Sequence, residues 1–135
     1  MPFNRPIVSP TGKLPQPMRS GAGMLANFAV YENAADAILT LTAAIIAGGK
    51  ISQTTTLTAD RIFTTDTAVN LAAANPGMEI GDAYSFVISS AQVGAFDIIV
   101  AGGVGVTLQG AGNVGLQCSR TFTLVKTAAA AFDLW

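Results

Sequence analysis

Residues Gly110 to Gly115, GAGNVG, have a glycine spacing that could bind a phosphate group. In a dinucleotide-binding enzyme, G-x-G-x-x-G follows a β-strand, turns under the pyrophosphate and opens a helix. Here a strand-like run, DIIVAGGVGVTLQ, precedes the motif, but the segment after it, SRTFTLVKT, alternates β-branched and apolar residues as a strand does. We therefore predict that Gly110, Gly112 and Gly115 form a tight connection or bulge between antiparallel strands, with no helix after it.

The other groups that could do acid–base or nucleophilic chemistry are few. The chain contains no histidine, so it lacks the usual general base and the commonest zinc ligand. Cys118 is the single cysteine, and its place before a strand favours a small, partly buried apolar side chain over a nucleophile. Glu79 and Asp82 are the closest candidate acid–base pair, but the glycines around them indicate a turn, and Asp60 beside Arg61 indicates a turn with a local ion pair. We expect no enzyme activity, no cofactor, no metal site and no small-molecule substrate.

The composition indicates a protein that associates with other protein surfaces. Only 11% of the 135 residues are charged, the net charge is −1 and the mean hydropathy is +0.49, whereas about 25% charged residues are usual in a soluble domain. With so few charges, neither repulsion nor hydration keeps copies apart. The best apolar run, residues 37–49, is shorter than a membrane span of about 20 residues, so we expect no membrane segment. The seven Lys and Arg residues form no basic stripe with interleaved aromatics, so we expect no nucleic-acid binding.

Residues 1–23 are expected to form an extended N-terminal arm. Five of the six prolines lie within residues 1–17, and proline fixes φ and removes a backbone donor. The same segment has no apolar core of the kind that a signal peptide needs, so no signal peptide is expected. Residues 24–135 are long enough for one domain with its own core.

Residues 24–135 are predicted to form an all-β fold. Short segments rich in β-branched or aromatic residues, among them AYSFVISS, AFDIIVAG and SRTFTLVKT, are bounded by Gly, Asp, Asn or Ser. One short helix is predicted near residues 67–75, where Thr67 can cap the first turn and Asn75 starts the stop signal NPG, whereas residues 37–46 fit either a strand or a helix. We therefore predict a compact antiparallel β-sandwich or barrel of jelly-roll type, with one short helix and the N-terminal arm.

Residues 40–126 resemble a group of small virion proteins of tailed bacteriophages. A Thr-rich stretch, KISQTTTLTADRIFTTD, leads to TAVNLAAAN, then to GDAYSF at residues 81–86, to the glycine-rich DIIVAGGVGVTLQG and to SRTFTLVKT. Proteins of this group are head decoration (cement) or accessory capsid proteins. The resemblance covers about two thirds of the chain. It implies a homotrimer of β-barrels that is assembled in the host cytoplasm and binds the major capsid protein on the capsid surface. One departure is the step before the helix, where the group often has proline and this chain has TTDT at residues 64–67.

The residues and the resemblance agree on a structural virion protein. We expect a capsid decoration or cement subunit that stabilises the phage head by oligomerising and by binding the major capsid protein. Phe3, Ile7 and Leu14 in the arm are expected to insert into pockets of a neighbouring subunit, because apolar side chains on an otherwise polar arm have no core of their own to join.

The alternative is a carbohydrate- or receptor-binding module of a phage head or tail fibre. Such a module needs an exposed aromatic platform, to which Tyr31, Tyr84 and Trp135 are the candidate contributors. Burial of an indole is strongly favourable, so we expect Trp135 to be an anchor in the core or in an interface instead.

Overall fold

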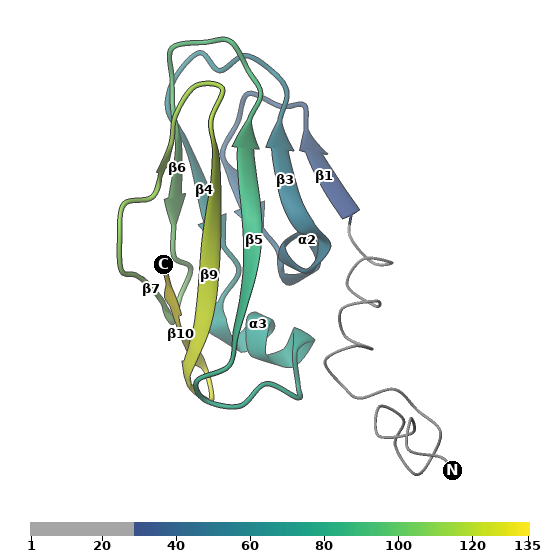
Figure 1. The fold of residues 1–135 in the computed structure, drawn as a ribbon, viewed down its shortest axis with the longest axis vertical. Coiled ribbons are helices and arrows are strands. Elements are labelled where there is room, and N and C mark those ends of the chain that lie inside the picture. The colour runs from purple at the N-terminus through teal and green to yellow at the C-terminus, as the bar shows by residue number, and fades with distance from the viewer. Residues whose placement is uncertain (1–28) are drawn as a thin grey trace, which may run out of the picture.

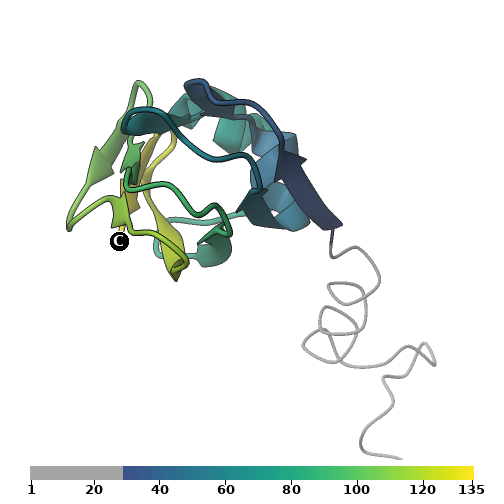
Figure 2. The same cartoon turned by 90° about the horizontal axis from the view of Figure 1, so that it is seen from above.

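The computed structural model describes residues 29–135, which fold into two β-sheets packed face to face (Figures 1 and 2). Sheet A has six strands in the order β1-β3-β5-β9-β10-β7, and sheet B has four in the order β2-β4-β6-β8. The strands of sheet A are β1 (Ala29–Asn33), β3 (Gly49–Gln53), β5 (Ala83–Ser90), β7 (Val106–Leu108), β9 (Ser119–Ala128) and β10 (Ala131–Leu134). Those of sheet B are β2 (Leu39–Leu41), β4 (Arg61–Thr65), β6 (Ile98–Ala101) and β8 (Asn113–Val114).

The chain alternates between the two sheets over its first six strands. The strands β1, β3 and β5 are parallel neighbours in sheet A, and β2, β4 and β6 are parallel neighbours in sheet B. The path is a two-sheet coil, in which each turn of the chain adds one strand to each sheet. The later strands complete the sheets: β9 is antiparallel to β5 and to β10, β8 is antiparallel to β6, and β7 is parallel to β10.

The predicted all-β antiparallel sandwich or jelly-roll is therefore wrong. Both sheets contain parallel and antiparallel pairs, and the described residues contain two helices where one was predicted. Alternation of inward and outward side chains is the same in parallel and antiparallel strands, so it did not reveal the pairing direction. Parallel neighbours need a long crossover connection, which is usually a helix. Here a strand in the opposite sheet forms part of each crossover.

Both helices lie in connections that lead from sheet B to sheet A. The helix α2 (Ala43–Gly48) follows β2 and leads into β3; the Thr42 hydroxyl caps its start, and Gly49 ends it at a φ of 92°. The helix α3 (Ala68–Ala74) follows β4, and the Thr67 hydroxyl accepts a hydrogen bond from the backbone N–H of Asn70. The segment that fitted either a strand or a helix contains both, since β2 ends one residue before the Thr42 cap.

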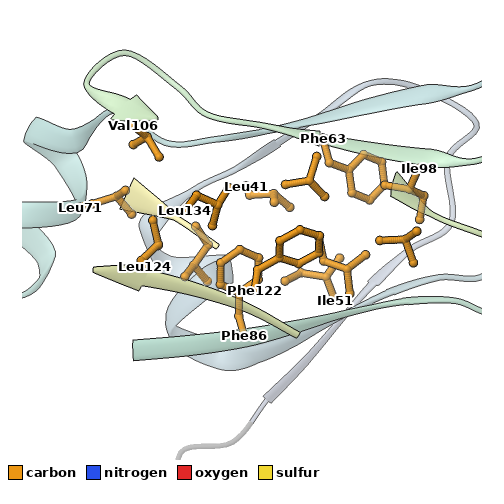
Figure 3. Packing of buried hydrophobic residues seen from close by; sticks show 14 of the residues in the cluster. Leu41, Ile51, Phe63, Leu71, Phe86, Ile98, Val106, Phe122, Leu124 and Leu134 are labelled. Atoms are coloured by element: carbon orange, nitrogen blue, oxygen red, sulfur yellow. The ribbon is translucent and has the colours of Figure 1, made fainter. Parts of the chain in front are cut away.

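The core lies between the inner faces of the two sheets. Phe86 and Phe122 are paired across β5 and β9, and their rings stack with centroids 5.8 Å apart. Figure 3 shows them beside Ile51 of sheet A and facing Phe63 and other apolar side chains of sheet B. Each of these four residues is at most 1% exposed, and truncation of a buried Phe to Ala typically costs about 3–5 kcal/mol.

Buried side-chain amides join successive turns of the coil where the chain leaves sheet A. Asn33 and Gln53 lie opposite each other at the ends of β1 and β3, and they are 6% and 0% exposed. The Nδ2 of Asn33 donates to the Oε1 of Gln53 at 2.6 Å. The Nε2 of Gln53 donates to the carbonyl oxygens of Ala35 (3.1 Å) and Thr55 (2.9 Å), so one amide holds both the loop after β1 and the loop after β3.

Gln92 connects the loop after β5 to the same stack. Its Oε1 accepts from the backbone N–H of Leu57 (3.3 Å) and of Gly94 (2.7 Å), and its Nε2 donates to the carbonyl oxygen of Phe96 (2.9 Å). Leu57 belongs to the loop after β3, so Gln92 bridges two loops. We call Asn33, Gln53 and Gln92 the amide ladder. Within residues 29–135, every buried side-chain nitrogen and oxygen has a hydrogen-bond partner.

Replacement of Gln53 by Leu should destabilise the fold by about 1–3 kcal/mol, because it removes the partners of a buried amide and of two loop carbonyls. Ser52→Ala is the matched control: Ser52 neighbours Gln53 but points outward, so its effect should stay within about 0.5 kcal/mol. Urea unfolding followed by circular dichroism measures both. A loss in Gln53→Leu no larger than in the control would show that the ladder does not stabilise the fold.

Candidate interaction surface

The glycine motif at residues 110–115 crosses between sheets. The strand before it, β7, pairs with β10 in sheet A, whereas β8, inside the motif, pairs with β6 in sheet B. The strands on either side of the motif, β7 and β9, run in opposite directions in sheet A, but β10 lies between them and β8 interrupts the connection, so the predicted tight turn is wrong. No helix follows the motif in residues 110–135, as predicted. Gly110, Gly112 and Gly115 do not have a positive φ. Only glycine fits at position 112, because a Cβ there would collide with the carbonyl oxygen of Val100. The two backbones lie this close because the N–H of Val100 donates to the carbonyl oxygen of Gly112 at 2.9 Å.

The acidic residues considered for catalysis have structural contacts instead. The backbone N–H of Glu79 donates to the Asp82 carboxylate at 2.8 Å, which closes the turn before β5. The predicted ion pair between Asp60 and its neighbour Arg61 is wrong. The Asp60 carboxylate instead accepts a hydrogen bond from the backbone N–H of Asp97 at 2.9 Å. Cys118 lies exposed directly before β9, so the predicted partly buried position is wrong. Within residues 29–135, no three His, Cys, Asp or Glu side chains gather into a possible metal site.

Arg61 pairs with a residue from the loop after β1. Its Nε donates to Asp36 at 2.7 Å, and the Thr58 hydroxyl donates to the other carboxylate oxygen of Asp36. The hydrogen bonds from Arg61 and Thr58 lower the pKa of Asp36 to about 2. The pair fastens the loop after β1 to the start of β4, on the side of the molecule where the amide ladder lies.

Asp66 joins the starts of both helices. One carboxylate oxygen accepts from the backbone N–H of Ala43 in α2 (3.0 Å), and the other accepts from the N–H of Thr67 (2.8 Å) and from the side chain of Asn70 (2.7 Å) at α3. Burial opposes the charged form, but the hydrogen bonds from Asn70, Ala43 and Thr67 outweigh it, so the pKa of Asp66 lies below its ordinary value. Asp66 lies in the segment TTDT at residues 64–67, and no motif there indicated that its carboxylate would bridge two helices.

The outer face of sheet A is the broadest strand surface of the molecule. We define it by the outward side chains of its strands, which are Val30, Glu32, Lys50, Ser52, Ala83, Ser85, Val87, Ser89, Thr107, Ser119, Thr121, Thr123, Val125 and Asp133. Most are small hydroxyl or apolar residues, and three are charged. The hydroxyls of Ser85 and Thr123 bond to each other at 2.8 Å, as do those of Ser89 and Ser119 at 3.1 Å. Each of these bonds satisfies one donor and one acceptor, which reduces the hydrogen bonding with water that is lost when the pair is covered.

The edge of sheet A at β1 carries a second apolar region that no other element of residues 29–135 covers. Val30 and Tyr31 are 48% and 38% exposed. An apolar hollow of about 230 Å³, which we call the β1 hollow, is lined by Ala29, Val30, Tyr31, Ala44, Ile45 and Gly48. The hollow lies between the edge strand and α2. In the sequence, Tyr31 was a candidate platform aromatic only, because the residue pattern does not reveal that β1 is an edge strand.

The three candidate platform aromatics do not lie together. Tyr84 faces inward from β5, where burial raises the pKa of its hydroxyl to about 12. Trp135 follows β10 and is 57% exposed as a residue, which excludes the predicted core position but not a position in an interface. Three strands of sheet A separate β1, which carries Tyr31, from β10.

Comparison with family models, with curated proteins and with solved structures found no match to this chain. Neither helix in residues 29–135 has the length and apolarity to cross a bilayer. The predicted arm residues Phe3, Ile7 and Leu14 lie outside the described residues, as does the whole arm segment 1–23.

Asp66→Ala should destabilise the protein by about 1–2 kcal/mol, because it removes the acceptor of the Ala43 N–H at the start of α2 and of the N–H of Thr67, the cap residue of α3. Glu79→Ala is the control, since it removes an exposed acid that no helix start uses. Thermal unfolding at pH 7 distinguishes the two variants. Equal stability in Asp66→Ala and Glu79→Ala would contradict the bridging role.

The Asp36–Arg61 contact predicts a specific acid sensitivity. Because the folded pKa of Asp36 is about 2 and the unfolded value is about 3.9, the contact contributes fully above about pH 4 and is lost as the pH falls toward 2. Asp36→Asn should be less stable than the wild type at pH 7, and the difference should shrink between pH 4 and pH 2. Urea midpoints measured across this range test it; a difference that stays constant with pH would exclude Asp36 as the titrating group.

Proposed function

We propose that the chain is a structural virion protein of the head decoration type, which stabilises a phage capsid by associating with copies of itself and with the major capsid protein. Its outer face of sheet A is the surface that we assign to the capsid. The arm, residues 1–23, is proposed as a second contact through Phe3, Ile7 and Leu14.

The observation that carries this proposal is the chemistry of the outer face of sheet A. A surface that stays in water usually carries many charges, whereas this face has Glu32, Lys50 and Asp133 as its only charged residues. Its central side chains are Ser, Thr and Val, and part of the hydroxyls bond to each other. Such a surface loses little hydration when a protein covers it, and apolar burial contributes about 25 cal/mol per Å² before the cost of association.

The exposed apolar side chains, together with the low content of charged residues, support an assembly role as well. Single exposed apolar residues are normal in a monomer. In this chain, however, they combine with a charged fraction of 11%, which leaves few groups to keep neighbouring copies apart. A structural subunit hides such a surface permanently.

Thr121→Lys, in the centre of the outer face, should weaken binding to empty capsid shells at least about tenfold, because a lysine there is desolvated without a partner. Thr40→Lys is the matched control on sheet B, where Thr40 is also exposed and points outward. Cosedimentation with shells of the major capsid protein encoded by the same genome measures both. The same assay on a chain without residues 1–23 measures how much the arm contributes to binding of the shells.

Two results would contradict the proposal. If the wild-type chain does not cosediment with these shells, the virion assignment is wrong. If Thr121→Lys and Thr40→Lys bind as the wild type does, the outer face of sheet A is not the surface that meets the capsid.

A further inference from the structure

We propose that two copies of this chain pair through the edge strand β1, antiparallel and about a two-fold axis, so that their A sheets join into one. This inference does not rest on the virion assignment, because it concerns the purified chain in solution. Its partner is a second copy, and the contact is isologous, with the same strand contributed by each side.

The strand β1 has the features of a pairing edge. One side of β1 hydrogen-bonds to β3, and the other side has no strand beside it within residues 29–135. Natural edge strands are usually protected by lysine, proline, a bulge or a covering element. The sequence of β1, AVYEN, contains neither lysine nor proline, and its pairing with β3 runs without a register shift.

The charges of this region select one register. Pairing centred on Tyr31 uses all five residues of β1 and places Val30 opposite Glu32 of the second copy. Centring on Glu32 would place two carboxylates directly opposite each other, which is unfavourable. Centring on Val30 would leave Glu32 and Asn33 outside the paired segment of residues 29–33.

The Tyr31-centred register also brings opposite charges together. Val30 pairs with Lys50 in β3, on the same face of the sheet. Lys50, Val30 and Glu32 of the second copy therefore form one row, in which the lysine and the glutamate are separated by two strand spacings, about 10 Å. Their long side chains can meet over the shorter Val30, and the two-fold axis forms this pair twice. Neither Lys50 nor Glu32 has an ion-pair partner within residues 29–135.

The same register covers the β1 hollow. Tyr31 faces inward with Ile51, its neighbour in β3, and lies opposite Tyr31 of the second copy. The two rings then cover each other beside Ala44 and Ile45, which line the hollow on α2. Because the axis is perpendicular to the sheet, both outer faces of sheet A point to the same side of the dimer.

Charge reversal tests whether a second copy is the partner and whether Lys50 of one copy lies near Glu32 of the other. Glu32→Lys and Lys50→Glu should each raise the dimer dissociation constant at least about tenfold, because each places like charges together. The double variant should return to within about threefold of the wild type, since the pair is restored with its signs exchanged. Glu79→Lys makes the same charge change on an exposed loop and should leave the dissociation constant unchanged. Sedimentation velocity of the full chain over a concentration series measures all four variants.

Cross-linking tests the register. In a Cys118→Ser background, Tyr31→Cys places two cysteines directly opposite each other, at the Cβ separation of an opposed strand pair, about 4.5–5.5 Å. It should form a disulfide-linked dimer on mild oxidation, whereas Val30→Cys should not, because its opposite residue is Glu32. Glu79→Cys is the control for random collision.

Three results would overturn the inference. The first is a wild-type chain that stays monomeric in sedimentation velocity when its concentration is raised 100-fold above the lowest one in the series. Another is an oligomer, a trimer included, whose mass neither charge reversal changes. The third is a monomer that dimerises only after residues 1–28 are removed, which would assign the edge to the chain's own N-terminal segment.

Discussion

The buried amides of Asn33, Gln53 and Gln92 are the interactions on which the rest of the structure depends. A chain that alternates between two sheets must turn repeatedly at the same end, and each turn leaves backbone groups without strand partners. A buried N–H or C=O without a partner costs about 1–3 kcal/mol. The amide ladder supplies these partners from inside, loop by loop, so the coil can close over the aromatic core. These loops connect the strands that lie parallel in each sheet, so the amide ladder joins successive turns of the coil.

The opposite end of the coil is organised by charge instead of amides. Asp66 accepts hydrogen bonds from the starts of α2 and α3, so one carboxylate fixes both connections that lead from sheet B back to sheet A. The two ends of the coil are therefore held by different kinds of hydrogen bond. Neutral amides stack the loops that leave sheet A, and a capped helix pair returns the chain to it. Between the two ends, apolar side chains such as Phe63, Phe86 and Phe122 fill the space between the inner faces.

The sequence allowed some of this to be predicted. Most strands and the helix at residues 67–75 could be read from alternation, from the Thr67 cap and from the stop signal at Asn75. Pairing direction could not, because residues far apart in the chain decide it. Residues 37–46 fitted either a strand or a helix, and the caps that bound α2, Thr42 and Gly49, became evident only in the structure. The surfaces could not be predicted from the sequence, because the outer face of sheet A and the edge position of β1 can be identified only from the strand order.

The most direct test of the parallel, amide-linked coil is the hydrogen exchange of side-chain amides measured by NMR. If the ladder exists in solution, the carboxamide protons of Gln53 and Gln92 exchange slowly, and nuclear Overhauser contacts join Ile51 to Ile88 across the parallel pair β3 and β5. Carboxamide protons that exchange as fast as those of an unfolded peptide, or contacts in an antiparallel register between these strands, would contradict the account.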